Sequence, residues 1–129
     1  MNRYRSFALL VLAPLALLSA SCQQHVVQAH PDAYAGVGLD LGANPEGPVV
    51  RAAIDGGAAQ HAGFAGGERI VSINGIPTRG MALASAVAKL RGAPGTAVEV
   101  LYDDAKGNRQ RVRLVRQPIR KEGEGYVAH

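Results

Sequence analysis

Short runs in which apolar and polar residues alternate make up much of the chain, and this pattern predicts β-strands. Leu39-Asp40-Leu41 alternates directly after a pair of closely spaced glycines and places both leucines on one face. Two runs rich in β-branched residues, 48–54 and 68–73, predict further strands, and residues 96–102 and 109–116 predict a hairpin. The sequence therefore favours a mainly β fold.

The second of the β-branched runs carries a definite prediction about its two faces. Strict alternation puts Ile70 and Ser72 on one face and Val71 and Ile73 on the other. Asn74-Gly75 follows directly, and both of these residue types accept a positive φ. We therefore expect a tight turn at the end of this strand.

A helical period marks residues 81–91 as the longer of two expected helices. Leu83, Val87 and Leu90 fall at i, i+4 and i+7, so they form one apolar stripe on this helix. Residues 55–63 predict a shorter helix of one or two turns, because the segment ends in a glycine that suits a helix C-terminus. The two helices and the strands together predict an α+β fold.

Residues 1–21 have the features of a secretory signal, namely an arginine-containing start, an apolar run and small residues at the end. Cys22 follows directly, and this resembles the lipobox of bacterial lipoproteins, although Ser19 stands where leucine is usual. The resemblance implies lipidation of Cys22 and, because Gln23 rather than aspartate follows, a place on the periplasmic face of the outer membrane. The alternative is ordinary cleavage after Ala20, which would release a soluble periplasmic protein.

Composition excludes several functional classes. The chain has 129 residues, enough for one small domain behind the leader, and its single cysteine excludes an intramolecular disulfide and a cysteine metal cluster. The formal net charge is +4, part of which comes from the leader, so a nucleic-acid partner is not expected. Residues 22–33 are polar and are expected to be a tether; His25 and His30 lie there without carboxylate partners, so no metal or cofactor is expected.

Several motifs occur in the order found in PDZ domains. Gly36-Val37-Gly38-Leu39 resembles their Gly-Leu-Gly-Phe carboxylate-binding loop. Residues 58–75 resemble the PDZ signature of a small helix, Ala-Gly-apolar, Gly-Asp-x-Ile and Ile-Asn-Gly, with Glu68 in place of the aspartate. Residues 90–96, followed by a valine-rich strand, are similar to PDZ domains of bacterial C-terminal processing proteases. This resemblance implies a bacterial-type PDZ domain, a five- to six-stranded partly open barrel with two helices.

The resemblance covers residues 34–119, and residues 120–129 are then expected to be a C-terminal tail. From Gln117 onward the charged sequence predicts no regular structure. The only serines after the leader are Ser72 and Ser85, and no base is placed beside either by the sequence, so no catalytic residue is expected.

The resemblance also implies a groove that binds the C-terminus of another protein. In it, backbone amides of the loop would hold the terminal carboxylate, and a pocket between strand and helix would take the last side chain. Leu83 would face the ligand residue two positions upstream and favour an apolar one. The implied ligand-binding residues are Val37, Gly38, Leu39, Leu41, Leu83, Val87 and Leu90. The alternative from the pattern alone is that these apolar residues are simply core.

The expected function is a non-catalytic, membrane-anchored module that binds apolar C-termini of periplasmic or membrane proteins by strand addition. An adaptor or regulatory subunit of a separate periplasmic protease, and a scaffold with a closed groove, stay open as alternatives. Arg109, Arg111 and Arg113 alternate along the last predicted strand, where they either protect a sheet edge by charge or contact lipid headgroups.

Overall fold

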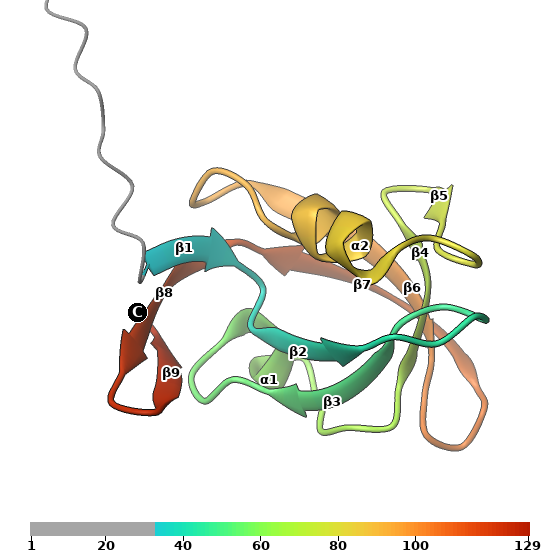
Figure 1. Cartoon of the computed structure of the whole chain (residues 1–129), viewed down its shortest axis with the longest axis horizontal. Coiled ribbons are helices and arrows are strands. Elements are labelled where there is room, and N and C mark those ends of the chain that lie inside the picture. The colour runs from blue at the N-terminus through green and yellow to red at the C-terminus, as the bar shows by residue number, and fades with distance from the viewer. Residues whose placement is uncertain (1–32) are drawn as a thin grey trace, which may run out of the picture.

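The computed structural model describes residues 33–129, so the predicted signal, Cys22 and the tether up to residue 32 lie outside the described residues. Within the described part the chain forms nine strands and two helices (Figure 1). The strands are β1 (Ala33–Gly36), β2 (Leu39–Gly42), β3 (Val49–Ala53), β4 (Arg69–Ile73), β5 (Ile76–Pro77), β6 (Ala97–Asp103), β7 (Arg109–Val115), β8 (Gln117–Glu122) and β9 (Gly125–Ala128). The helices are α1 (Ala58–His61) and α2 (Leu83–Leu90).

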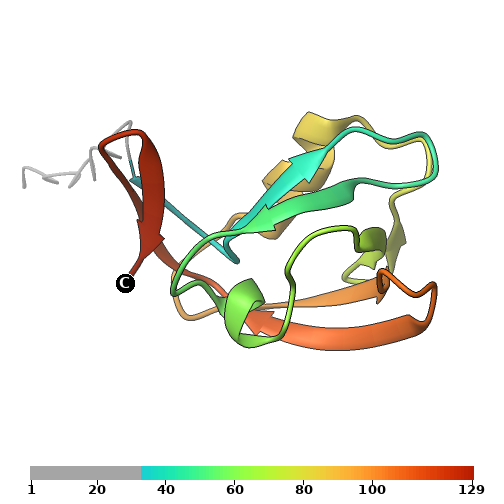
Figure 2. The same ribbon diagram turned by 90° about the horizontal axis from the view of Figure 1, so that it is seen from below.

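Six strands form the main sheet in the order β2-β3-β4-β6-β7, with β5 paired to β4. A second sheet has the order β1-β8-β9, and the two sheets are not closed into a barrel. Figure 2 shows the β2–β3 hairpin on one side, β6 and β7 on the other, and the β8–β9 hairpin standing at one end. The predicted mainly β fold with two helices is therefore confirmed, with two open sheets in place of a single barrel.

The predicted hairpin of β6 and β7 is confirmed by seven antiparallel residue pairs from Ala97↔Val115 to Asp103↔Arg109. The tight turn after β4 is also confirmed, because Asn74 and Gly75 have φ angles of 49° and 77° and Ile73 pairs with Ile76.

The expected alternation along β4 is wrong. Ile70 and Ile73 are both fully buried, although strict alternation put them on opposite faces. The reason is a register shift against β6, where Ile70 pairs with Tyr102 but Ser72 already pairs with Leu101. The extra residue, Val71, makes a bulge that turns both isoleucines into the core.

The expectation of no regular structure from Gln117 onward is also wrong. Residues Gln117–Glu122 form β8, which pairs along its first four residues with β1, and Gly125–Ala128 form β9. Ile119 on β8 is fully buried, so this segment has an apolar anchor. Charged residues conceal the strand pattern in the sequence because one face of this small sheet is exposed to solvent.

The core lies between the main sheet and the helices. α2 is shorter than the predicted helix at both ends, but its stripe packs inward as expected, with Ala86 and Leu90 buried and Leu83 and Val87 half-buried against the core. The fully or nearly fully buried apolar residues are Val37, Leu41, Val50, Ala59, Phe64, Ile70, Ile73, Ala86, Leu90, Val98, Val100, Leu114 and Ile119.

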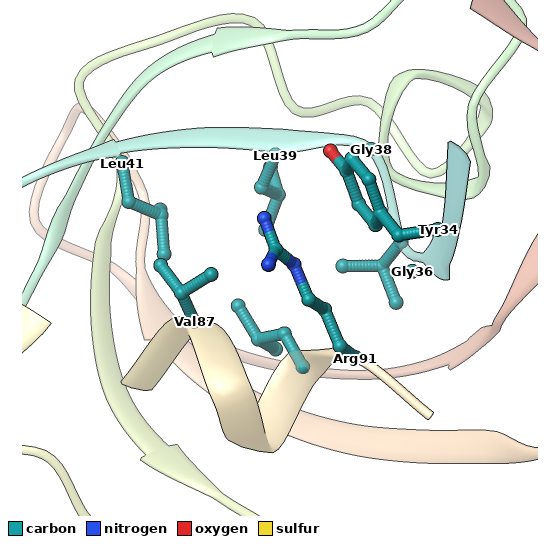
Figure 3. A pocket seen from close by; sticks show the side chains of 9 residues that line it. Tyr34, Gly36, Gly38, Leu39, Leu41, Val87 and Arg91 are labelled. Atoms are coloured by element: carbon teal, nitrogen blue, oxygen red, sulfur yellow. The ribbon is translucent and has the colours of Figure 1, made fainter. Parts of the chain in front are cut away.

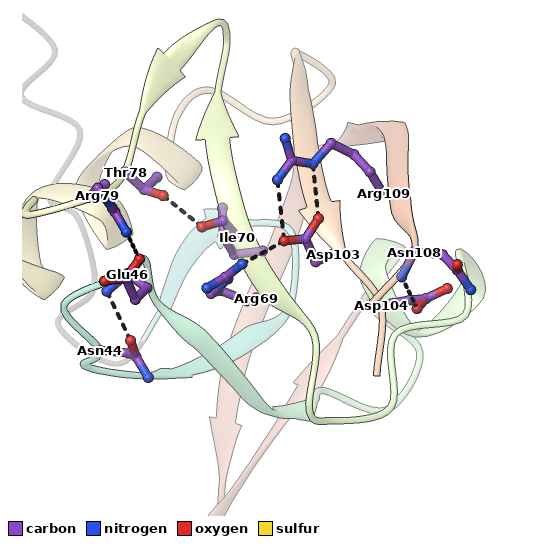
Figure 4. A network of polar contacts seen from close by, with 10 residues as sticks. All are labelled: Asn44, Glu46, Arg69, Ile70, Thr78, Arg79, Asp103, Asp104, Asn108 and Arg109. Carbon is purple, nitrogen blue, oxygen red and sulfur yellow. Dashed lines mark hydrogen bonds and ion pairs between the residues drawn. The ribbon is translucent and has the colours of Figure 1, made fainter. Parts of the chain in front are cut away.

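Ion pairs between charged side chains link strands β4, β6 and β7 of the main sheet (Figure 4). The Asp103 carboxylate on β6 accepts from Arg69 Nη2 on β4 at 2.7 Å and from Arg109 Nε on β7 at 2.9 Å. Arg111 pairs with Glu99 at 3.2 Å. β7 is the edge strand of the sheet, and Arg109 and Arg111 are exposed on it. Charged side chains at a sheet edge discourage pairing with another chain.

Glu68, the departure from the PDZ signature, is buried and has its charge satisfied by the loop before β4. Its carboxylate accepts from the amide of Ala65 at 3.0 Å and from the amide of Gly66 at 2.9 Å. Glutamate thus closes the loop with two charge-assisted hydrogen bonds.

In residues 33–129, no helix is long and apolar enough to cross a membrane.

Candidate functional site

β2 offers a free strand edge beside α2. It is the end strand of the main sheet and pairs there only with β3, so its other edge has unpaired backbone groups. α2 lies along that side, in contact with β2 (Figure 1). Strand and helix together thus form the two walls of a groove.

The loop from β1 to β2 lies at the end of this groove, and its carbonyls are turned into the protein. The Val37 carbonyl accepts from the Ala59 amide at 2.9 Å, and the Gly38 carbonyl accepts from the Ile54 amide at 2.8 Å. In a trans peptide the N–H points opposite to the C=O, so the amides of Gly38 and Leu39 point away from these partners. Among backbone hydrogen bonds outside the helices and strands of residues 33–129, none is donated by Val37 or Gly38.

Gly38 has a φ of +77°, a backbone conformation in which a residue with a side chain is strained. An added Cβ would also lie 3.3 Å from the Gly57 Cα. Val37, only 2% exposed, holds the loop against the core. The loop is therefore a fixed set of amide donors, of the kind that binds an anion.

An apolar cavity of about 40 Å³ lies between the loop, β2 and α2 (Figure 3). Six of the seven predicted ligand-binding residues line it: Val37, Gly38, Leu39, Leu41, Val87 and Leu90. Leu83 does not line it; this residue lies at the first position of α2, half-buried against the core. Ser72 on β4 and Ser85 on α2 do not line it either.

The structure adds Tyr34, Gly36 and Arg91 to the cavity lining. The Arg91 Cζ lies 4.2 Å from the centroid of the Tyr34 ring, in a cation–π contact. Partial burial raises the pKa of Tyr34, although the nearby Arg91 opposes this shift. Sequence reasoning missed both residues, because Arg91 lies off the apolar stripe of α2 and Tyr34 precedes the glycine motif.

A wider cavity of about 590 Å³ continues from the groove toward the β8–β9 hairpin. Tyr126 on β9 packs edge-on against Tyr34, with 6.3 Å between the ring centroids. Three carboxylates, those of Asp40, Asp55 and Glu124, belong to residues that line this outer cavity. The β8–β9 hairpin thus closes one end of the groove. The outer cavity that leads into the groove carries these three acidic side chains.

Arg116 fixes the C-terminal end of α2. Its guanidinium donates to the Lys89 carbonyl at 3.0 Å and to the Leu90 carbonyl at 3.1 Å, and it also reaches Thr96 Oγ1 and the Ala97 carbonyl. The last carbonyls of a helix lack partners within the helix, and a cation there also interacts favourably with the helix dipole. The groove wall is thereby held by a side chain that lies between β7 and β8.

Comparisons with known proteins agree with this arrangement. The PDZ domain family model matches residues 49–103, which run from β3 to the end of β6. A carboxyl-terminal-processing protease of Picosynechococcus sp. is 34% identical over 87 residues, 65% of this chain and 21% of that protein. The chain therefore spans about a fifth of the curated relative that it matches.

Two solved structures are similar over most of the described residues. The photosystem II D1 C-terminal processing protease aligns with a TM-score of 0.61 and 29% identity, covering 70% of this chain and 24% of that one. The PDZ domain of the carboxy-terminal protease from Vibrio cholerae, solved in complex with a peptide, aligns with a TM-score of 0.62 and 24% identity. That match covers 69% of this chain and 99% of the Vibrio domain.

Proposed function

Because the chain carries a PDZ domain homologous to those of carboxyl-terminal processing proteases, we propose that it is a non-catalytic module that binds apolar C-termini of exported proteins by strand addition. The single observation that carries the proposal is the free edge of β2 beside α2, with the amide loop and the apolar cavity at one end of it. The PDZ domain of the Vibrio protease, which has the same fold, was solved with a peptide.

In this mechanism the ligand pairs with β2 as an antiparallel strand. Its terminal carboxylate accepts hydrogen bonds from the amides of Val37, Gly38 and Leu39. Its last side chain enters the cavity lined by Leu39, Val87 and other apolar residues. One buried apolar side chain contributes about 1.5–3 kcal/mol, and a hydrogen bond to a charged group about as much, before the cost of ordering the peptide. We expect a dissociation constant of about 1–100 μM, since 1 μM corresponds to about 8 kcal/mol.

The test is fluorescence polarisation with hexapeptides that end in an apolar residue, each made as the free acid and as the C-terminal amide. The acid should bind at micromolar concentration and the amide at least tenfold more weakly, because amidation removes the charge that the loop amides hold. Val87→Glu should abolish binding by placing a charge in the cavity. Val115→Glu is the matched control, since Val115 is 43% exposed on β7 at the far edge of the sheet. Equal binding of acid and amide, or no binding of either, contradicts the proposal and favours a closed-groove scaffold.

A role as adaptor or regulatory subunit of a separate periplasmic protease is the second candidate. It is favoured by the homology to carboxyl-terminal processing proteases, of which the chain matches about a fifth. In an assay with such a protease from the same host, the chain should speed cleavage of a substrate whose C-terminus binds the groove. A cleavage rate that does not change with added chain contradicts this role.

The proposed location is the periplasmic face of the outer membrane, through a lipid on Cys22. Residues 22–33 span at most about 40 Å when fully extended, so the groove would meet its partners near the membrane surface. Two or more acyl chains are needed for stable anchoring. The proposal rests on the signal-like leader and the single cysteine that follows it.

A further inference from the structure

Arg91 reaches across the groove from the end of α2 toward β1 and β2 (Figure 3). Its guanidinium carbon lies 4.2 Å from the centroid of the Tyr34 ring, and both residues line the same cavity as Gly38. Tyr126 packs against Tyr34 edge-on and supports it from the hairpin side. The ring therefore holds the arginine side chain in one orientation beside the amide loop.

The guanidinium has hydrogen-bonding capacity left for a ligand. Within residues 33–129, no carboxylate lies within 4.0 Å of it, although five other arginines and His129 have such partners. Its side chain also has a hydrogen-bond contact with the Tyr34 hydroxyl, which leaves most of its five N–H donors for a ligand. Arginine presents its donors as a planar fork that matches the two oxygens of a carboxylate.

The acidic surroundings favour a cation beside an anionic ligand. Asp40, Asp55 and Glu124 line the outer cavity that a peptide C-terminus must approach, and Arg91 lines it as well. Like charges repel an arriving carboxylate, and a cation at the mouth of the loop offsets that repulsion.

We infer that Arg91 binds the C-terminal carboxylate of the peptide ligand together with the loop amides, and that Tyr34 is its positioning residue. This inference rests on the proposed peptide-binding function and names the side chain that makes the groove selective for a free C-terminus. The resemblance to PDZ domains assigned that selectivity to backbone amides alone.

The experiment measures the affinity ratio between acid and amide forms of one apolar hexapeptide, in wild type and in variants. Arg91→Gln should lower the affinity for the acid about tenfold, which corresponds to about 1.4 kcal/mol, and leave that for the amide unchanged. Tyr34→Leu should lower the ratio by a smaller factor, because it removes both the ring and the hydroxyl that Arg91 contacts. Tyr34→Phe keeps the ring and removes only the hydroxyl, so its ratio should lie closer to the wild-type value. Arg113→Gln, which removes an exposed charge on β7, is the matched control and should keep the wild-type ratio.

Three results would overturn the inference. An unchanged ratio in Arg91→Gln means that the arginine does not contact the carboxylate. Equal weakening of acid and amide means that it only packs against the peptide. Tighter binding of both forms means that it covers the groove and must be displaced. In each case wild type still binds the acid, whereas failure of wild type to bind any acid peptide would refute the proposed function itself.

Discussion

Arg116 donates a hydrogen bond from Nη2 to the Lys89 carbonyl at 3.0 Å, across 27 residues of sequence. The arginine is only 9% exposed, and the carbonyls that its guanidinium meets belong to the last turn of α2 and the start of β6. A side chain outside the groove thus fixes the helix that forms one of its walls.

Arg116→Ala should lower the free energy of unfolding by about 2–4 kcal/mol, because several buried carbonyls lose a charged donor. Arg116→Lys should recover only part of this, since an ammonium cannot reach acceptors on both segments as the planar fork does. Urea unfolding followed by circular dichroism measures the effect. The control is Arg113→Ala, an exposed arginine on β7, which should change stability by less than about 0.5 kcal/mol. A similar loss in both alanine variants would contradict the capping role.

Gly38→Val should abolish binding of the acid peptide. The substitution forces a β-branched residue into a φ of +77° and brings its Cβ against the Gly57 backbone, so the loop amides shift. The left-handed strain alone costs about 1–2 kcal/mol. Gly107→Val is the matched control, because Gly107 has a φ of +85° with nothing within 4 Å of an added Cβ. Gly107→Val should lower the free energy of unfolding by a similar amount while the peptide affinity stays at the wild-type value. Loss of binding in both variants would point to general destabilisation.

The stability of the domain should fall between about pH 4 and pH 2 in a way that depends on Asp103. Hydrogen bonds from Arg109 and Arg69 lower the pKa of this carboxyl from 3.8 to about 2. A group whose pKa is lower in the folded state stabilises the fold above its unfolded pKa, and this contribution is lost as the pH falls through the folded value.

Asp103→Asn should therefore destabilise the domain at pH 7, and its difference from wild type should shrink toward pH 2. Urea midpoints at pH 7, 5, 4, 3 and 2 give the curve. Asp40→Asn serves as control, since Asp40 is exposed and its nearest cation, Arg51, lies 3.8 Å away. A difference between wild type and Asp103→Asn that is constant over this range would show that the two arginines do not act through the charged carboxylate.

Cys22→Ser should move the protein from the membrane fraction to the soluble periplasmic fraction. Without the thiol no acyl chain is attached, and each buried methylene contributes about 0.8 kcal/mol to membrane binding. Fractionation of cells measures the membrane association, and mass spectrometry of the mature N-terminus shows the cleavage site and any attached lipid. A wild-type protein that is already soluble and begins at Ser21 would contradict the lipid anchor.

How far the sequence predicts the structure depends on whether a feature is local. The turn at Asn74-Gly75 and the stripe of α2 were predictable because their signals lie within a few residues. The bulge at Val71 was not, since it exists only as a mismatch of length between β4 and β6. Strand β8 escaped prediction because its partner, β1, is over 80 residues away and its residues other than Ile119 are mostly exposed.

The candidate groove likewise has residues that the sequence indicates and a contact that it does not indicate. Seven residues of the loop, β2 and α2 were identified through the order of PDZ motifs, and six of them line one cavity. The contact of Arg91 with Tyr34 joins residues from opposite sides of the groove, and no spacing in the sequence indicates it.

The loop at Gly36–Gly38 connects two different sheets, since β1 pairs with β8 and β2 pairs with β3. This arrangement has a mechanical consequence. Tension applied to the chain ahead of Ala33 first loads the ladder between β1 and β8, where four residue pairs resist it together. Force on the N-terminal segment is therefore transmitted through these pairs to β8 before it can distort the loop amides that face the groove.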